Sequence, residues 1–156
     1  MRFIILCLLI AAGGLVQAQD LSPWGAAKVT ETSYAPQKVV YDVALSSPEQ
    51  LDAVLDRVSG LSMVYQADPF DASIVLVLHG QEMSFFDARN FQKHEALMRR
   101  AQSLTVGGVI EFRMCQLAAA GMGIQPEHVH GFVEMIPMGD AEIVRLQKEA
   151  GYAYMH

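Results

Sequence analysis

Two side chains in this sequence have the chemistry of a nucleophilic site, a thiol and an imidazole. Cys115 follows the strand-like residues 109–114 and precedes the helix-forming residues 116–120. A thiol at such a junction faces free backbone amides and the positive end of a helix dipole, and both favour the thiolate. His79 ends the apolar run 72–78, where an imidazole can stabilise a thiolate or exchange a proton. The pattern predicts Cys115 as a nucleophilic sulfur with His79 as its partner at the rim.

The first 18 residues have the pattern of a secretory signal. Arg2 precedes the apolar run 3–12, and Gly13 and Gly14 then weaken the helix before a cleavage site that ends at Ala18. A membrane anchor needs about 20 consecutive apolar residues, and this run is shorter. We therefore predict a signal peptide over residues 1–18 and a periplasmic protein without stable membrane insertion after cleavage.

The composition limits what the remaining chain does. The protein has 156 residues, of which 52% are hydrophobic and 18% charged, as expected for one globular domain. Its 11 Lys and Arg face 17 Asp and Glu, and no basic run exists, so nucleic acid is not a predicted partner. Of the 2 cysteines, only Cys115 lies outside the signal, so it cannot form an internal disulfide. Four possibilities remain for Cys115. It is buried and inert, it is bonded to another molecule, it binds a ligand such as a metal ion, or it is a reactive thiol.

Strand and helix patterns alternate along the chain. Residues 19–36 have no consistent period and are predicted as an extended arm, and residues 37–156 as one domain. Strands are expected at residues 38–45, 72–78, 109–114, 131–136 and 152–155, with helices from 48, over 90–104, over 115–120 and after 140. This order predicts an α/β fold, a three-layer sandwich with a mostly parallel five-stranded sheet. Loops at the carboxyl ends of its strands are expected to build the site.

Several local sequences resemble one known family. KVVYDV, VLVLHG, GVIEFRMCQLAAAGMGI and LQKEAGYAYMH are similar to segments of the DsrE/DsrF-like proteins, which include the TusD sulfur-relay subunits. The segment MCQLAA, residues 114–119, looks like the one where these proteins carry the cysteine that accepts a sulfane sulfur. The resemblance implies that Cys115 carries a persulfide. It also implies that the second and third strands are neighbours, which would bring His79 close to Cys115.

The leading expectation is an exported DsrE-like sulfurtransferase or sulfur carrier that binds or transfers sulfane sulfur on Cys115, with His79 beside it. Its expected partners are sulfur donor and acceptor proteins or small sulfur compounds, and the resemblance favours a homo-oligomer. We predict neither a cofactor nor a metal. Two alternatives remain open. One is a non-catalytic periplasmic binding or assembly module in which Cys115 is structural. The other is a copper protein that uses His128, His130 and the thioethers of Met135 and Met138.

Overall fold

The structure is a computed structural model that describes residues 24–156. The predicted signal peptide and the first part of the predicted arm, residues 19–23, lie outside the described residues. Residues 24–36 contain neither helix nor strand. The chain divides into two units, and the second, Ser33–His156, holds every helix and strand of the described chain. Among residues 24–156, no helix is long and apolar enough to cross a membrane.

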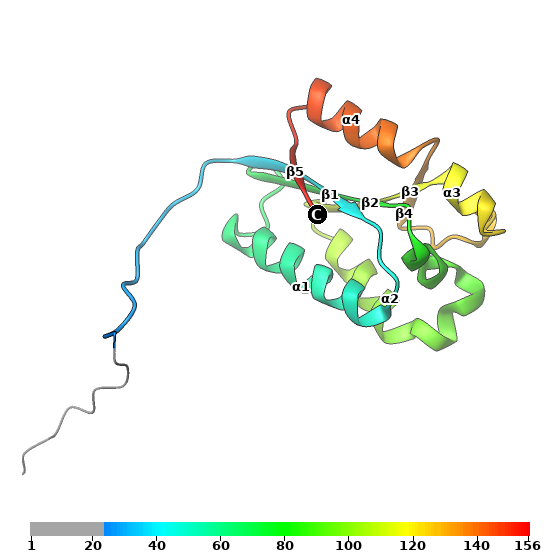
Figure 1. The fold of residues 1–156 in the computed structure, drawn as a ribbon, viewed down its shortest axis with the longest axis horizontal. Coiled ribbons are helices and arrows are strands. Elements are labelled where there is room, and N and C mark those ends of the chain that lie inside the picture. The colour runs from blue at the N-terminus through cyan, green and yellow to red at the C-terminus, as the bar shows by residue number, and fades with distance from the viewer. Residues whose placement is uncertain (1–23) are drawn as a thin grey trace, which may run out of the picture. The chain divides into compact units, whose positions relative to one another are not determined.

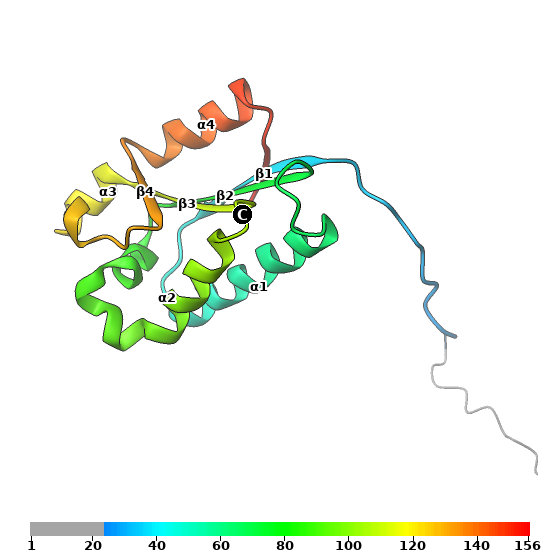
Figure 2. The ribbon, with the colours of Figure 1, turned by 180° about the vertical axis from the view of Figure 1, so that it is seen from behind.

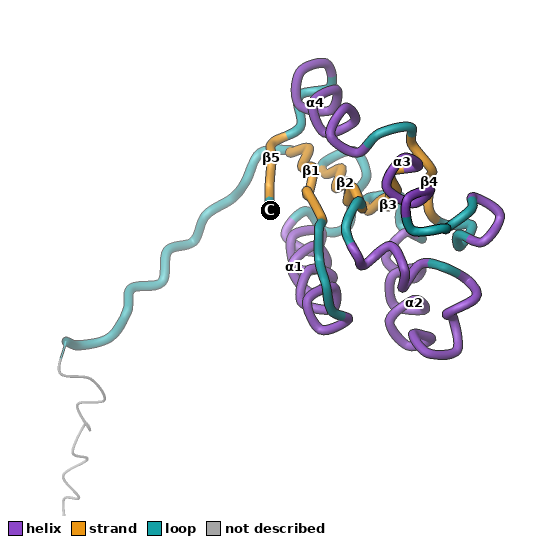
Figure 3. The backbone as a smooth tube through the Cα atoms, turned by 45° about the vertical axis from the view of Figure 1, so that its right-hand side comes forward, coloured by secondary structure: helices purple, strands orange, loops and turns teal. Residues whose placement is uncertain are grey.

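A five-stranded sheet forms the middle of the domain (Figure 3). Its strands are β1 (Gln37–Val43), β2 (Ala72–Leu78), β3 (Ile110–Cys115), β4 (Val133–Ile136) and β5 (Ala153–Met155). They lie in the order β4-β3-β2-β1-β5, and every pair of neighbours is parallel. The predicted α/β fold is confirmed, and the sheet is parallel throughout. The expected neighbours β2 and β3 are also adjacent.

Helices cover both faces of this sheet (Figures 1 and 2). The helices are α1 (Pro48–Val64), α2 (Phe91–Thr105), α3 (Gln116–Gly121) and α4 (Gly139–Glu149). Helices α1 and α2 pack on one face, where Leu55 and Met98 are buried in the larger core. Helix α4 covers the other face and buries Ile143 and Leu146 against Val77 and its neighbours. Two helical layers with the sheet between them make the predicted three-layer sandwich.

Local sequence signals explain where these elements begin. Ser47 accepts the backbone N–H of Gln50, and the Gln50 side chain accepts the N–H of Ser47, so a capping box opens α1 with Pro48 in its first turn. Strand β2 is almost entirely apolar and buried because it lies at the centre of the sheet, covered on both faces. The capping signal therefore explains where the crossover helix α1 begins, and the apolar run explains the strand that follows it.

The segment after β2, for which the sequence predicts neither helix nor strand, is not an irregular loop. It folds into two short 3-10 helices, Gln81–Phe86 and Ala88–Asn90, before α2 begins. Phe86 is fully buried, and its ring lies 5.5 Å from that of Phe112 on β3. Because Phe86 is buried, the segment packs against the core. The spacing of hydrophobic residues over so short a stretch does not predict this packing.

Candidate functional site

The carboxyl ends of the parallel strands meet at one edge of the sheet, and this edge carries a small hollow of about 190 Å³. We refer to it as the Cys115 hollow. It is lined by His79 and Cys115 at two strand ends, by Leu117 and Ala118 of α3, and by Met138, Gly139 and Asp140 at the start of α4. Segments that follow β2, β3 and β4 therefore come together at this edge, whereas the segment after β1 contributes no residue to the hollow.

Cys115 is the last residue of β3 and the N-cap of α3. Its Sγ accepts the backbone N–H of Ala118 at 3.4 Å, as a capping side chain does. The residue is only 4% exposed, yet its side chain forms part of the wall of the hollow. The backbone thus orients the sulfur through one hydrogen bond, and the residue borders the hollow.

Gly139 allows the start of α4 to lie close to both His79 and Cys115. A Cβ atom at this position would lie 3.3 Å from His79 Cβ and 3.5 Å from Cys115 Cβ, so both side chains pack against the glycine backbone. Met138, the N-cap of α4, provides no side-chain cap. The start of α4, with the positive end of its dipole, therefore faces the space between the imidazole and the thiol. The helix dipole favours negative charge in the hollow, and the carboxylate of Asp140, which also lines it, opposes such charge.

A chain of hydrogen bonds fixes the imidazole of His79. Its Nε2 lies 2.5 Å from Asp42 Oδ1, and the Tyr154 hydroxyl donates to Asp42 Oδ2 at 2.6 Å. Burial alone would raise the pKa of Asp42, but the hydrogen bonds from Tyr154 and His79 outweigh it and hold the pKa below its usual value. Asp42 is therefore ionised at neutral pH and acts as an acceptor, so Nε2 of His79 carries the proton.

The backbone on either side of His79 is held by Glu82, a fully buried carboxylate. Glu82 Oε1 accepts the N–H groups of His79 at 3.1 Å and Gly80 at 2.8 Å, and Oε2 accepts that of Leu45 at 2.6 Å. Burial raises the pKa of Glu82, and these backbone donors lower it in part. The carboxylate ties the loop after β1 to the loop after β2, and so positions His79.

Gly80 is required by close packing. A Cβ atom here would lie 2.5 Å from Glu82 Oε2 and 2.7 Å from Ala44 Cα, and the second of these neighbours is backbone that cannot swing away. A glycine at the end of a strand allows a tight turn or the close approach of another group. The structure shows that it allows the approach of Ala44 and Glu82.

Arg113 lies on the same face of β3 as Cys115, since the strand geometry continues to the cysteine. Its guanidinium bonds Glu142 of α4 and Glu111, at 2.7 Å from the latter, and lies 3.2 Å from Glu134. Hydrogen bonds from Arg145, followed by those from Arg113, hold the pKa of Glu142 below its usual value. Arg113 thus anchors α4 to the sheet, and it is not among the residues that line the Cys115 hollow.

The histidines of the copper alternative lie elsewhere. The ring of His130 stacks on Phe132 at 5.7 Å and meets Phe91 edge-on at 5.5 Å. His130 Nε2 and His128 Nδ1 are buried without a hydrogen-bond partner. Within residues 24–156, no three His, Cys, Asp or Glu side chains converge as metal ligands would. Burial lowers the pKa of His130, as expected for an imidazole among aromatic rings.

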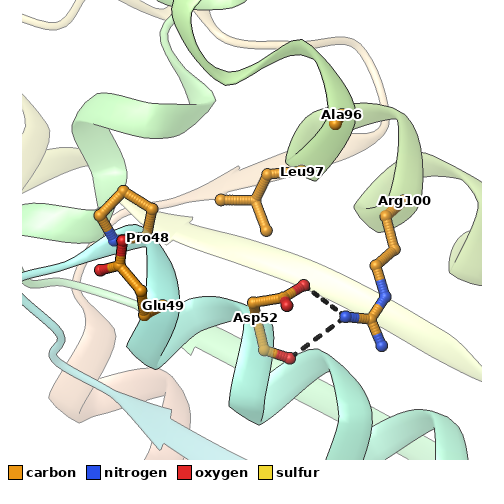
Figure 4. Close-up of a pocket in the computed structure, with 6 residues that line it drawn as sticks. All are labelled: Pro48, Glu49, Asp52, Ala96, Leu97 and Arg100. Carbon is orange, nitrogen blue, oxygen red and sulfur yellow. Dashed lines mark hydrogen bonds and ion pairs between the residues drawn. The ribbon is translucent and has the colours of Figure 1, made fainter.

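A larger hollow, about 350 Å³, lies between the start of α1 and α2 (Figure 4). Pro48, Leu97 and Ala96 form its apolar part, and Arg100 bonds Asp52 across it. The Arg100 guanidinium also bonds Asp56. It contains neither a thiol nor an imidazole, and its one cation is neutralised by two carboxylates. Size alone therefore does not locate the chemistry.

The two side chains predicted to form the site, Cys115 and His79, line the same hollow. Sequence reasoning missed Asp42 and Tyr154, and it gave Glu82 no role. Asp42 left a signal, because it is the one acidic residue of β1 and directly follows the buried residues 39–41. Tyr154 left none, because its place beside Asp42 depends on the pairing of β1 with β5.

Comparison with known proteins supports the fold. No protein-family model matches the chain, and no curated protein sequence matches it. The solved structure of MTH1491, a protein of unknown function from Methanobacterium thermoautotrophicum, is similar to it with a TM-score of 0.63. The likeness covers 76% of this chain and 97% of that chain at 18% sequence identity. At this identity the likeness shows a shared α/β fold alone.

Proposed function

We propose that the protein is an exported, DsrE/DsrF-like sulfur carrier or sulfurtransferase that takes up sulfane sulfur as a persulfide on Cys115. The observation that carries the proposal is that Cys115 and His79 meet in one small hollow at the carboxyl edge of the sheet. A thiol that accepts sulfur needs a fixed sulfur atom, a nearby proton acceptor and space for one more sulfur.

Each of these requirements has a counterpart in the geometry. The N–H of Ala118 holds Sγ at 3.4 Å, and the imidazole of His79 lies at the same hollow with its orientation set by Asp42. A hollow of about 190 Å³ admits a persulfide or a short polysulfide but leaves little room for a large organic substrate. The uncapped start of α4 favours the negative charge that a persulfide carries.

The test is sulfur loading of the protein that lacks residues 1–18. Incubation with a small persulfide or polysulfide donor is expected to add the mass of one sulfur atom to the peptide that contains Cys115. Treatment with a reductant should remove it. A rhodanese loaded in parallel provides the positive control. A thiol that stays unmodified under conditions that load the rhodanese would contradict the proposal.

A binding or assembly module with a structural cysteine is the second candidate, and one observation favours it. Cys115 is only 4% exposed, and unpaired cysteines commonly serve as small apolar side chains in protein cores. The two candidates differ in one property, the access of a small reagent to Cys115 in the folded protein. Copper binding is a weaker candidate, because His130 lies among aromatic rings and, within residues 24–156, no three His, Cys, Asp or Glu side chains converge on a common point.

For partners, we propose sulfur donor and acceptor proteins or small sulfur compounds in the periplasm, and self-association of the chain. Leu117 and Met138 support a protein partner, because they line the hollow and are 66% and 42% exposed. Exposed apolar side chains beside a reactive group give a donor or acceptor protein a surface to cover.

A further inference from the structure

The strongest unassigned feature at this edge of the sheet is the chain of side chains that runs from β5 through β1 to β2. Asp42 bridges two partners with different oxygens, His79 through Oδ1 at 2.5 Å and Tyr154 through Oδ2 at 2.6 Å. In the sheet register Tyr154 pairs with Val40, and Asp42 pairs with Val77. The chain therefore crosses three adjacent strands and advances toward the edge at which β3 ends with Cys115.

We propose that Asp42 and Tyr154 are positioning residues that fix His79 as the proton acceptor for Cys115. Asp42 accepts the Nε2 proton, which leaves Nδ1 as the ring nitrogen that acts as the base. The Tyr154 hydroxyl holds the carboxylate in place from the opposite side. Cys115, His79 and Asp42 then form a Cys–His–Asp arrangement of the kind that activates nucleophiles in unrelated folds, and β5 supports it through Tyr154.

The inference rests on the proposed function for the chemistry that follows proton transfer. The Cys115 S–H bond breaks, its proton moves to Nδ1 of His79, and the electron pair stays on sulfur. This sulfur attacks the outer sulfur of a donor persulfide, R–S–SH. A new S–S bond forms, the S–S bond of the donor breaks, and the leaving R–S⁻ takes the proton from Nδ1. The products are the Cys115 persulfide and R–SH, so no external oxidant or reductant is needed.

Several titratable groups surround His79 on the elements packed around it. Asp42 lies on β1, and Glu82 binds the His79 backbone from the segment after β2. Asp140 lines the hollow from α4, and Cys115 does so from β3. His156 lies beside Tyr154, with their rings 6.2 Å apart, and its charge acts on Asp42. Because the groups other than Asp42 are common to all of the variants below, a changed profile reports on the replacement at Asp42 or Tyr154.

The test is the pH profile of Cys115 alkylation by iodoacetamide in the protein without residues 1–18, compared among Asp42→Asn, Tyr154→Phe and the unchanged chain. We expect Asp42→Asn to react about tenfold more slowly near neutral pH, with its rate rising at higher pH, since the carboxylate no longer selects the Nε2 proton. Tyr154→Phe should shift the profile in the same direction by less. Tyr152→Phe is the matched control, because it removes a hydroxyl that bonds Ser73 at 2.8 Å, and its profile should match that of the unchanged chain.

Profiles of Asp42→Asn and Tyr154→Phe that superimpose on the unchanged profile would overturn the inference. If Asp42→Asn does not fold, the inference is tested by the profile of Tyr154→Phe and by the nitrogen NMR shifts of His79 in the unchanged protein. A proton on Nδ1 of His79 would contradict the inference. Alkylation uses no sulfur donor. Failure of sulfur loading with a shifted Asp42→Asn profile would therefore overturn the proposed function and leave the arrangement of Asp42, His79 and Cys115 supported.

Discussion

Replacing Cys115 with serine is expected to abolish sulfur loading while the fold remains intact. The hydroxyl is smaller than the thiol but also accepts an N–H, and serine is a favoured N-cap, so it can replace Sγ as the acceptor for Ala118. The serine hydroxyl does not ionise at neutral pH, so it cannot attack a sulfane sulfur as a thiolate does. Cys115 is also the one cysteine outside residues 1–18, so no second thiol can take its place.

Mass spectrometry after incubation with the persulfide donor measures this effect, and thermal unfolding of both proteins provides the control. The expected result is complete loss of the added sulfur with a melting temperature close to that of the unchanged protein. A serine variant that still gains a reducible sulfur would show that loading occurs at another atom. A variant that unfolds far more easily would point instead to a structural role for the thiol.

Replacing Glu82 with alanine is expected to cause the largest loss of stability among single changes at this edge of the sheet. The fully buried carboxylate accepts three backbone N–H groups, from Leu45, His79 and Gly80. Removing it leaves these donors without their acceptor and leaves a cavity between two loops. The burial of a carboxylate is itself unfavourable, which offsets part of the cost, so we expect a net loss of about 3 kcal/mol in the free energy of unfolding.

Urea unfolding measures this loss, and two further variants make it specific. Glu82→Gln keeps the shape but places an NH₂ group against an N–H donor, so it should lose nearly as much stability. Glu127→Ala removes an exposed glutamate and should change the free energy of unfolding by less than about 0.5 kcal/mol. A loss below about 1 kcal/mol for both Glu82 variants would contradict the role assigned to this carboxylate.

The elements were largely predictable because their signals are local. The apolar run Ala72–Leu78 is β2 as expected, and the capping pattern at Ser47 and Gln50 opens α1. The segment after Gly80 was not predictable, since its 3-10 helices follow from the burial of Phe86 against Phe112 on a different strand. Local sequence patterns also do not predict the order of the strands, because the order depends on which strands pair with β2 along its two edges.

The site was predictable only in part, for the same reason. Cys115 and His79 could be found because strand ends are visible in the sequence and parallel strands place those ends at one edge. Tyr154 could not, because it reaches Asp42 across 112 positions of sequence through the pairing of β5 with β1. The role of Gly139 was likewise not predictable, because it depends on the side chains of His79 and Cys115, which pack against this glycine.

The most direct measurement of the central claim is the rate at which a small alkylating reagent modifies Cys115 in the folded protein, relative to the same protein in denaturant. If the hollow of about 190 Å³ gives access to Sγ, the folded and unfolded rates should agree within about one order of magnitude. If Cys115 instead reacts only when the whole protein unfolds, the rate in the folded protein should be lower than the rate in denaturant by a factor of about a thousand or more. That second result would contradict the sulfur chemistry and support the structural role of the cysteine.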